Sequence, residues 1–252
     1  MPDDERWHYS PARDLGLRGL DRLASTRRET GLAGALGSEA CARALHAYLR
    51  GVHRLRVSGR EHVPADPPGL IVANHASHLD ALVILAALPA GRRRATYVIS
   101  AADRFFTSPA RAGAAAGLIN AIALRRGGTG RHELGHLRER LAHEPCRLIV
   151  FPEGTRSRSG EMGAFRDGVG SLVAATAVPV TPCFLTGTHA AMPPGARVPR
   201  PRRIACAFGP PLTFADTPST REGWREIAAA LRQVVTNLGA HAGLDPLAST
   251  LE

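Results

Sequence analysis

Short, nearly unbroken apolar runs recur along this chain, and most are followed by a turn and then by a stretch of helical character. Residues 69–74 (GLIVAN) and 147–151 (RLIVF) are the clearest examples. A run of this length, bounded by turn-forming residues, is typical of a strand that is buried on both faces of a parallel sheet. The sequence therefore predicts a central, largely parallel sheet.

The rest of the chain alternates strands and helices in the same way. We expect further strands at 54–58, 95–100, 119–124, 179–186 and 203–208, and helices at 78–88, 108–118, 129–142, 168–177 and 219–239. The Pro- and Arg-rich stretch 192–203 is expected to be a surface loop. Alternating strands and helices predict an α/β fold, in which a single domain over residues 56–252 has its sheet flanked by helices.

Residues 1–55 precede this pattern and are expected to form N-terminal helices. One apolar stripe contains Leu17, Leu20 and Leu23, and a second contains Leu45, Tyr48, Leu49 and Val52; arginines flank both. Two interpretations stay open: helices that pack on the core, or a basic amphipathic element that lies on a membrane surface.

The charge balance is strongly basic. The formal net charge is +10, and every basic side chain counted is arginine, because the sequence contains no lysine. A basic surface attracts nucleic acid, anionic lipid headgroups or acidic ligands, and charge alone does not choose among them. Aromatic residues make up only 5% of the chain, which denies it the stacking surface of single-strand nucleic-acid binders.

The cysteines and the apolar segments indicate the compartment. Four scattered cysteines (Cys41, Cys146, Cys183 and Cys206) argue against both a disulfide framework and a zinc site. The N-terminus is acidic and polar, unlike a secretory signal. No stretch reaches the roughly 18–20 strongly apolar residues that span a bilayer. We therefore expect a cytoplasmic protein that attaches, at most, to the inner face of the cell membrane.

The segment NHASHLD, at residues 74–80, places a histidine just after a predicted strand. This is the sheet edge where α/β proteins hold ligands. Asp80 lies about one helical turn into the next helix, and a carboxylate there would make His75 a base that works near neutral pH. Two alternatives stay open. Ser77 and Asp80 also match a helix-capping box, and His75, His78 and Asp80 would form a metal cluster, although no further ligand lies nearby in the sequence.

A second segment, FPEGTRSRSG at residues 151–160, also follows an apolar run. Its glycine permits a close backbone approach, its threonine adds a hydroxyl and its arginine adds a charged fork, a combination that suits a phosphate. The candidate residues are Glu153, Gly154, Thr155 and Arg156, joined by Arg126 at the end of another predicted strand. The alternative is a solvated basic loop. A P-loop is excluded because it requires a lysine, and no G-x-S-x-G elbow of a serine hydrolase occurs.

In chain order these blocks resemble the glycerophosphate and lysophosphatidate acyltransferase family, whose hallmarks are a His-x4-Asp block and a Glu-Gly-Thr-Arg block. Further blocks that fit are AIALRRGG at 121–128, FRDG at 165–168 and VPVTPCF at 178–184. The first 55 residues match no block. Arg125 stands where many relatives carry Asp, and no lysine accompanies Arg166, so the acceptor's identity stays open.

The resemblance implies transfer of a fatty acyl group from acyl-CoA or an acyl carrier protein to the free hydroxyl of a lysophosphatidate-like acceptor, a step of phospholipid biosynthesis. His75 would deprotonate the hydroxyl and Asp80 would orient it. The phosphate would be bound by Arg126, Glu153, Gly154, Thr155 and Arg156. Neither a metal nor a cofactor is implied, and the expected partners are the acyl donor, the acceptor and a membrane surface, without nucleic acid. Two alternatives remain: a thioester or phosphoester hydrolase that uses the same His–Asp pair, and a basic lipid-binding module.

Overall fold

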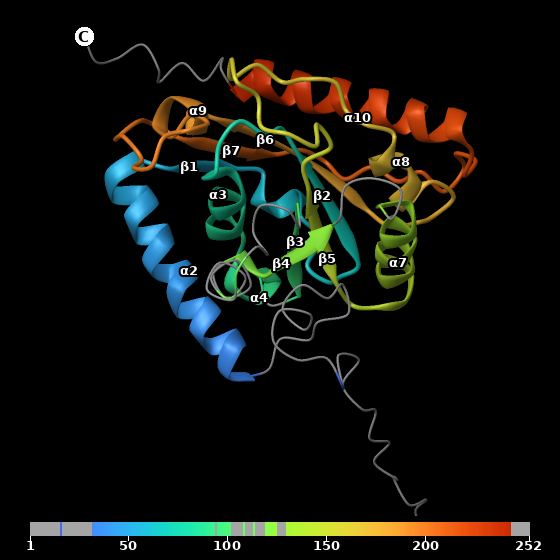
Figure 1. The fold of residues 1–252 in the computed structure, drawn as a ribbon, viewed down its shortest axis with the longest axis horizontal. Coiled ribbons are helices and arrows are strands. Elements are labelled where there is room, and N and C mark those ends of the chain that lie inside the picture. Colours follow the sequence, from blue (N-terminus) through green and yellow to red (C-terminus); the bar gives the residue numbers. More distant parts are fainter. Residues whose placement is uncertain are drawn as a thin grey trace, which may run out of the picture.

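One sheet runs through the protein and organises everything else (Figure 1). The computed structural model describes residues 16, 32–93, 95–101, 108, 113, 119–124 and 130–242. Within them, seven strands lie in the order β1–β7–β6–β2–β5–β3–β4. Their bounds are β1 (Arg56–Ser58), β2 (Gly69–Ala73), β3 (Thr96–Ala101), β4 (Ala121–Leu124), β5 (Arg147–Val150), β6 (Val180–Thr186) and β7 (Ala205–Phe208).

Neighbouring strands are parallel, except that β6 and β7 are antiparallel. The central strand is β2, which pairs with β5 on one side and with β6 on the other. All five of its residues are buried, which explains why its sequence is apolar throughout. The predicted α/β fold with a largely parallel sheet is confirmed.

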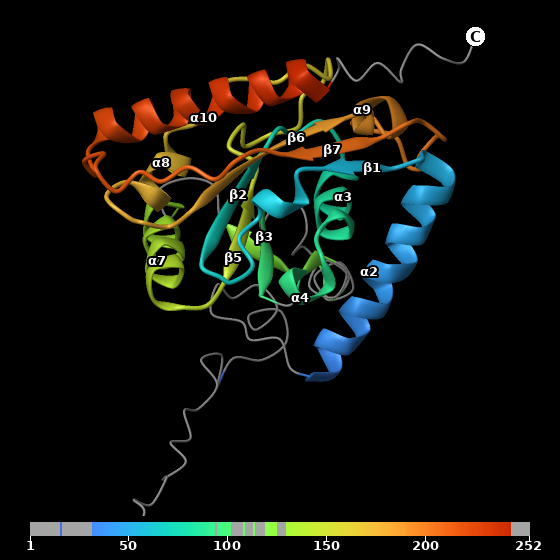
Figure 2. The ribbon, with the colours of Figure 1, turned by 180° about the vertical axis from the view of Figure 1, so that it is seen from behind.

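Helices cover both faces of the sheet (Figures 1 and 2). The helical elements are α2 (Leu32–His53), α3 (Asp80–Ala87), α4 (Ala90–Arg93), α7 (Gly130–His143), α8 (Gly168–Val173), α9 (Thr188–Ala191), α10 (Arg221–Ala242) and the 3₁₀ turn η1 (Arg60–His62). Alternate residues of β2 enter two separate cores. Ile71 packs with α2 and α3, whereas Leu70 packs with α7, α8 and α10. This alternation fixes the register of the strand.

Several elements differ from the sequence-based expectation. The pattern does not predict α4, α9 or η1, because a single turn is too short to show a helical period. The helix expected at 168–177 ends at Val173, because the backbone N–H of Ala175 turns away to the carbonyls of Phe214 and Thr217. Most of the helix expected at 108–118 lies outside the described residues.

The described part of the N-terminal segment is the helix α2. Its Leu49 is fully buried against the α3 layer, and Leu45 is partly buried there, whereas Tyr48 and Val52 are exposed. The helix ends where Arg54 adopts a positive φ of 48° and the N–H of Leu55 bonds to the carbonyl of Leu49 at 3.1 Å. The stripe at residues 17–23 lies outside the described residues. None of the helices in the described ranges is both long enough and apolar enough to cross a membrane.

Substitutions at two glycines test how closely α8 and α10 pack. A Cβ on Gly170, in α8, would lie 2.5 Å from the Cα of Trp224 in α10, so Gly170→Ala should lower the free energy of unfolding by about 1–3 kcal/mol. A Cβ on Gly135, in α7, meets nothing within 4 Å, and Gly135→Ala should raise it by about 1 kcal/mol. Urea denaturation measures both. Equal stability of Gly170→Ala and the wild type would contradict the close approach of α8 and α10.

Candidate functional site

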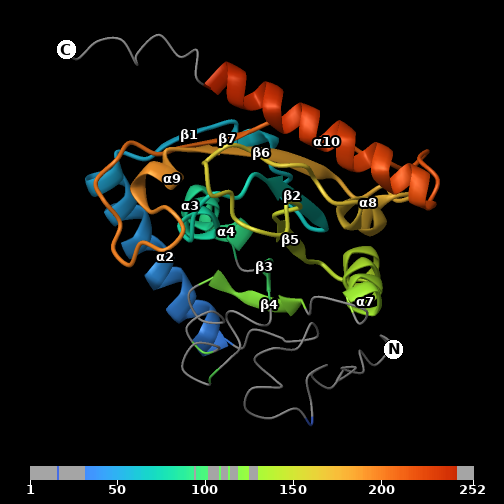
Figure 3. The same cartoon turned by 45° about the horizontal axis from the view of Figure 1, so that its top comes forward.

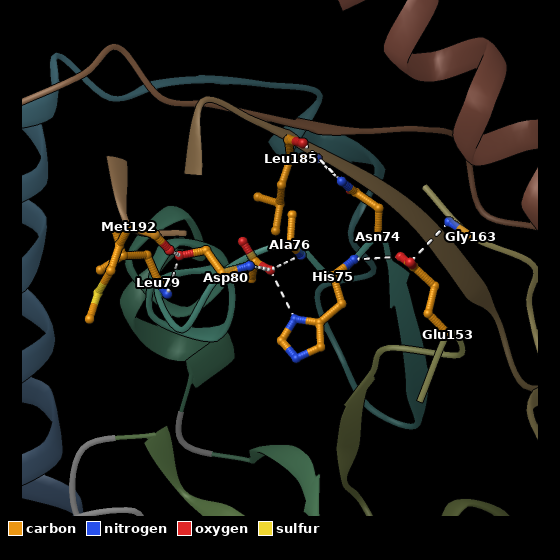
Figure 4. Close-up of polar contacts among 10 residues, drawn as sticks. Asn74, His75, Ala76, Leu79, Asp80, Glu153, Gly163, Leu185 and Met192 are labelled. Carbon is orange, nitrogen blue, oxygen red and sulfur yellow. Dashed lines mark hydrogen bonds and ion pairs between the residues drawn. The ribbon is translucent and has the colours of Figure 1, made fainter. Parts of the chain in front are cut away.

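The structure brings His75 and Asp80 together at the carboxyl end of β2 (Figure 4). His75 lies two residues beyond the strand, and Asp80 is the first residue of α3. The imidazole Nδ1 is 2.8 Å from the carboxylate Oδ2. Asp80 is completely buried, while the His75 side chain is 22% exposed. One end of this pair is therefore closed to solvent, and the other is accessible.

The same carboxylate oxygen makes two further contacts. Oδ2 of Asp80 accepts hydrogen bonds from the backbone N–H groups of Ala76, at 2.7 Å, and of Ser77, at 2.8 Å. The contact from Ser77 N–H to the Asp80 carboxylate is one half of a capping box. The other half is missing, because the Ser77 hydroxyl accepts the N–H of Leu79 at 3.1 Å, whereas the Asp80 N–H bonds to the Ser77 carbonyl at 3.5 Å. One oxygen therefore contacts both the backbone before α3 and the imidazole, so the capping contact does not exclude a role for Asp80 in proton transfer.

These contacts define how the imidazole is presented. Oδ2 accepts two backbone N–H groups and therefore carries no proton of its own. In its contact with His75 it must again be the acceptor, so the proton lies on Nδ1 of the imidazole. The lone pair is then left on Nε2, which lies on the side of the ring away from Asp80 (Figure 4). The ring also stacks on Phe151, with centroids 4.2 Å apart and planes at 21°. The arrangement can accept a proton from a group that approaches Nε2.

The Glu-Gly-Thr-Arg turn holds the backbone of His75 from both sides. The N–H of His75 donates to Oε1 of Glu153 at 2.7 Å, and its carbonyl accepts the N–H of Ser157 at 2.8 Å. The second oxygen of Glu153 accepts the N–H of Gly163 at 3.0 Å (Figure 4). Burial raises the pKa of Glu153, and the hydrogen bonds from the Gly163 and His75 backbone partly offset that rise. The two sequence blocks thus form one connected unit.

Two features of the structure favour glycine at position 154. Its φ is 72°, a region that side chains disfavour, and an added Cβ would lie 2.8 Å from Nε of Arg166. The guanidinium of Arg166 therefore packs directly against this turn, and the Arg166 N–H also bonds to the Pro152 carbonyl at 2.9 Å. Thr155 is exposed and Arg156 is half-buried on the same turn. Arg166 is thus a further cation at the site.

The sequence did not predict two contacts that hold the His75 segment in place. They are made by Asn74 and Ser77, which both lie inside the block NHASHLD. The side-chain amide of Asn74 donates to the Leu185 carbonyl at 3.0 Å and accepts the Leu185 N–H at 2.8 Å, which joins the end of β2 to β6. The Ser77 hydroxyl donates to the Met192 carbonyl at 2.7 Å. Only their position beside His75 could have indicated these roles.

Arg126, the other predicted phosphate ligand, lies outside the described residues. The strand before it, β4, ends at Leu124 and is separated from β2 by β3 and β5. Its convergence on the site stays a prediction.

Another histidine pair lies on α7, away from this unit. His132, Glu133 and His136 match the H-E-x-x-H pattern of zinc hydrolases, and the two Nε2 atoms are 3.0 Å apart. Across the described ranges, however, no group of three or more His, Cys, Asp or Glu side chains is placed to hold a metal ion. This applies to the α7 pair and to the described cluster at His75, His78 and Asp80.

The sequence matches known proteins over the same region. Residues 54–186 match the family model described as Acyltransferase. The 1-acyl-sn-glycerol-3-phosphate acyltransferase alpha of Homo sapiens is 33% identical over 141 residues, which are 55% of this chain and 47% of that protein. The chloroplastic 1-acyl-sn-glycerol-3-phosphate acyltransferase BAT2 of Brassica napus is 31% identical over 147 residues, which are 57% of this chain and 40% of that protein. The chain spans about half the length, or less, of these relatives.

The fold also has a counterpart among solved structures. The crystal structure of the 1-acyl-sn-glycerophosphate acyltransferase PlsC from Thermotoga maritima superposes with a TM-score of 0.60. It is 23% identical in sequence and covers 81% of this chain and 79% of its own, so it establishes a shared fold. The family model spans more than half of the chain and includes both the His75–Asp80 block and the turn from Glu153 to Arg156, and the chain therefore belongs to the acyltransferase family.

Proposed function

We propose that this protein transfers a fatty acyl group from acyl-CoA or an acyl carrier protein to the free hydroxyl of a lysophosphatidate-like acceptor. The observation that carries the proposal is the His75–Asp80 pair, whose buried carboxylate fixes the ring and leaves Nε2 facing outward. Membership of the acyltransferase family and the names of the human and Brassica relatives support it. The protein would work in phospholipid synthesis, in the cytoplasm and at a membrane surface.

The chemistry follows from the pair. Nε2 of His75 removes the proton of the acceptor hydroxyl while the hydroxyl oxygen attacks the thioester carbonyl. When the tetrahedral intermediate collapses, its carbon–sulfur bond breaks, and the leaving thiolate takes the proton from Nε2. Asp80 keeps the proton on Nδ1 throughout and stabilises the transient imidazolium, because its carboxylate is held 2.8 Å away.

The acceptor's phosphate would lie against the turn that follows β5. Arg156 and Arg166 supply guanidinium groups there, and Gly154 and Thr155 supply a close backbone and a hydroxyl. We assign Glu153 a different task from the one the resemblance implied. Both of its oxygens accept backbone N–H groups, so it positions His75 and does not bind an anion.

One experiment separates this reaction from hydrolysis. The protein is incubated with acyl-CoA, with and without lysophosphatidate, while free thiol and lipid products are measured. Thiol release that depends on the acceptor, with one phosphatidate formed per thiol, is the expected result. Release that is independent of the acceptor would show a hydrolase, and no release with either acyl-CoA or acylated carrier protein would refute the proposed activity.

His75→Ala should abolish turnover without loss of the fold, because it removes the base. General-base catalysis typically contributes about 10²–10⁴-fold, so kcat should fall at least that far. His78→Ala is the matched control, since this exposed histidine lies three residues away, and its effect should be mild. Acyl transfer by His75→Ala at near-normal rates would contradict the mechanism.

Glu153→Gln should reduce kcat more than it raises either KM, because the amide cannot accept both backbone N–H groups that hold the His75 segment. An unsatisfied buried donor typically costs about 1–3 kcal/mol, so the variant should also unfold at lower urea concentration.

The raised pKa of Glu153 predicts that this difference in stability depends on pH. Between the ordinary and the raised pKa, the folded wild type binds more protons than the unfolded chain. The stability advantage of the wild type over Glu153→Gln should therefore shrink as pH rises through this window. A difference that does not change with pH would contradict the raised pKa.

Arg156→Ala should raise the KM for the acceptor and change the KM for the donor little. The loss of a charge-assisted hydrogen bond typically costs about 1.5–3 kcal/mol, which is roughly a tenfold to hundredfold change. Arg156→Lys should restore part of the affinity, because lysine lacks the planar fork. Arg158→Ala, at an exposed arginine of the same loop, is the control. If both KM values rose together in Arg156→Ala, the arginine would instead be binding the donor.

A further inference from the structure

The loop between α9 and β7 lies beside the proposed active site and has an unusual composition. Residues 192–203 read MPPGARVPRPRR, with four prolines, four arginines and no acidic residue. The loop starts at the His75 block, because the Met192 carbonyl accepts the Ser77 hydroxyl at 2.7 Å. The start of the loop is therefore anchored two residues along the chain from His75.

Hydrogen bonds hold the loop along its length. The N–H of Arg200 donates to the Ala191 carbonyl at 2.7 Å. At the far end, Nδ1 of His53 contacts the Arg202 carbonyl at 3.2 Å, and the N–H of Ile204 donates to the His53 carbonyl at 3.0 Å. Proline also fixes φ at four positions. The loop is thus held in one shape before it meets a partner.

The same contacts join the loop to the end of α2. The buried His53 is the last residue of α2, and its Nε2 lies 3.3 Å from the hydroxyl of Tyr48. Figures 1, 2 and 3 agree that the chain after α9 lies against the C-terminal end of α2. The loop and the last turns of α2 therefore make one continuous surface, which we call the α2–loop surface.

Both segments of the α2–loop surface carry exposed apolar side chains. Over the described part of the chain, the large apolar side chains that are exposed are Tyr48 at 39%, Val52 at 40% and Val198 at 74%. Single exposed apolar residues are common on proteins, but here all three fall on two segments that touch. Val198 is the most exposed of them, and it sits on a loop that prolines stiffen.

The same two segments also carry exposed arginines. The exposed arginines of the two segments are Arg50, Arg54, Arg197, Arg200, Arg202 and Arg203. Neither residues 40–60 nor residues 188–203 contain Asp or Glu, so no acidic neighbour within these segments cancels the charge. Exposed apolar side chains and arginines on one surface are the combination that binds the interface of an anionic bilayer, where the aliphatic stems and apolar tips enter and the guanidinium groups meet phosphates.

We propose that the α2–loop surface docks the protein on an anionic lipid bilayer, with Val198, Tyr48 and Val52 entering the headgroup layer. The inference rests on the proposed function, because a lipid acceptor must reach His75 from a bilayer. It assigns the contact to the loop 192–203 as well as to the N-terminal helix. An acidic protein such as an acyl carrier protein would also be attracted by the arginines, but its charged surface offers no apolar layer for Val198, Tyr48 and Val52 to enter.

Vesicle co-sedimentation of the full chain tests the charged part of the surface. The wild type should bind phosphatidylglycerol-containing vesicles at low salt, and should bind them weakly at high salt or with phosphatidylcholine alone. Each arginine near such a surface contributes roughly fivefold in binding, so Arg197→Gln/Arg200→Gln should bind roughly 25-fold more weakly. Arg221→Gln/Arg225→Gln, which removes two exposed arginines from α10, is the matched control and should change binding by less than twofold. Equal losses in the two double variants would overturn the assignment.

Val198→Trp tests the apolar part. The fluorescence added by this tryptophan, over that of the wild type, should shift to shorter wavelength with phosphatidylglycerol vesicles, and brominated lipid should quench it. A tryptophan that stays in water while the protein is bound would overturn the insertion of the loop.

Activity on a short-chain acceptor below its critical micelle concentration separates docking from catalysis. Arg197→Gln/Arg200→Gln should keep wild-type kcat and KM on this dissolved acceptor; a loss there would overturn the docking role. Weaker binding of acyl carrier protein by this variant, with vesicle binding unchanged, would also overturn it. If the wild type binds vesicles through the loop yet transfers no acyl group, the docking inference stands and the proposed function falls.

Discussion

The site depends on one oxygen atom. Oδ2 of Asp80 accepts hydrogen bonds from the His75 ring and from the backbone N–H groups of Ala76 and Ser77, all within 2.8 Å. The carboxylate is fully buried, so it cannot exchange these donors for water without opening the start of α3. The contacts just before α3 therefore also orient the His75 ring, which we propose to be the catalytic base. A conformational change that moved this oxygen would disturb the helix start and the imidazole together.

The second constraint is the joining of two blocks that lie far apart in sequence. Glu153 is 78 positions from His75, yet its carboxylate accepts the His75 N–H at 2.7 Å because β2 and β5 are parallel neighbours that end at the same edge. The same turn carries Arg156 and packs Arg166 against Gly154. The proposed phosphate side of the site and His75 thus share one structural support. Positioning of the acceptor's hydroxyl relative to Nε2 would follow from this shared support.

The structural features that depend on neighbouring residues in the chain were predictable from the sequence. The apolar runs of β2 and β5 were predictable because burial on both faces leaves no polar positions. The approach of Asp80 to His75 was also predicted, but by a different geometry: Asp80 is the first residue of α3 and does not lie one helical turn into it. The early end of α8 was not predictable, because it depends on carbonyls of Phe214 and Thr217 some forty residues away in sequence. The positioning role of Glu153 was hidden for the same reason. Its residue type suggested a ligand contact, whereas the fold turns both of its oxygens toward backbone N–H groups.

The central claim is that Asp80 acts on catalysis through His75. A double-mutant cycle measures this most directly, with kcat/KM for acyl transfer determined for His75→Ala, Asp80→Asn and the double variant. The account predicts that Asp80→Asn is strongly impaired in the wild-type background but costs almost nothing once His75 is absent, because residues that act as a unit are not additive. If Asp80→Asn slowed His75→Ala by the same factor as it slows the wild type, Asp80 would act independently of the base and the account would be contradicted.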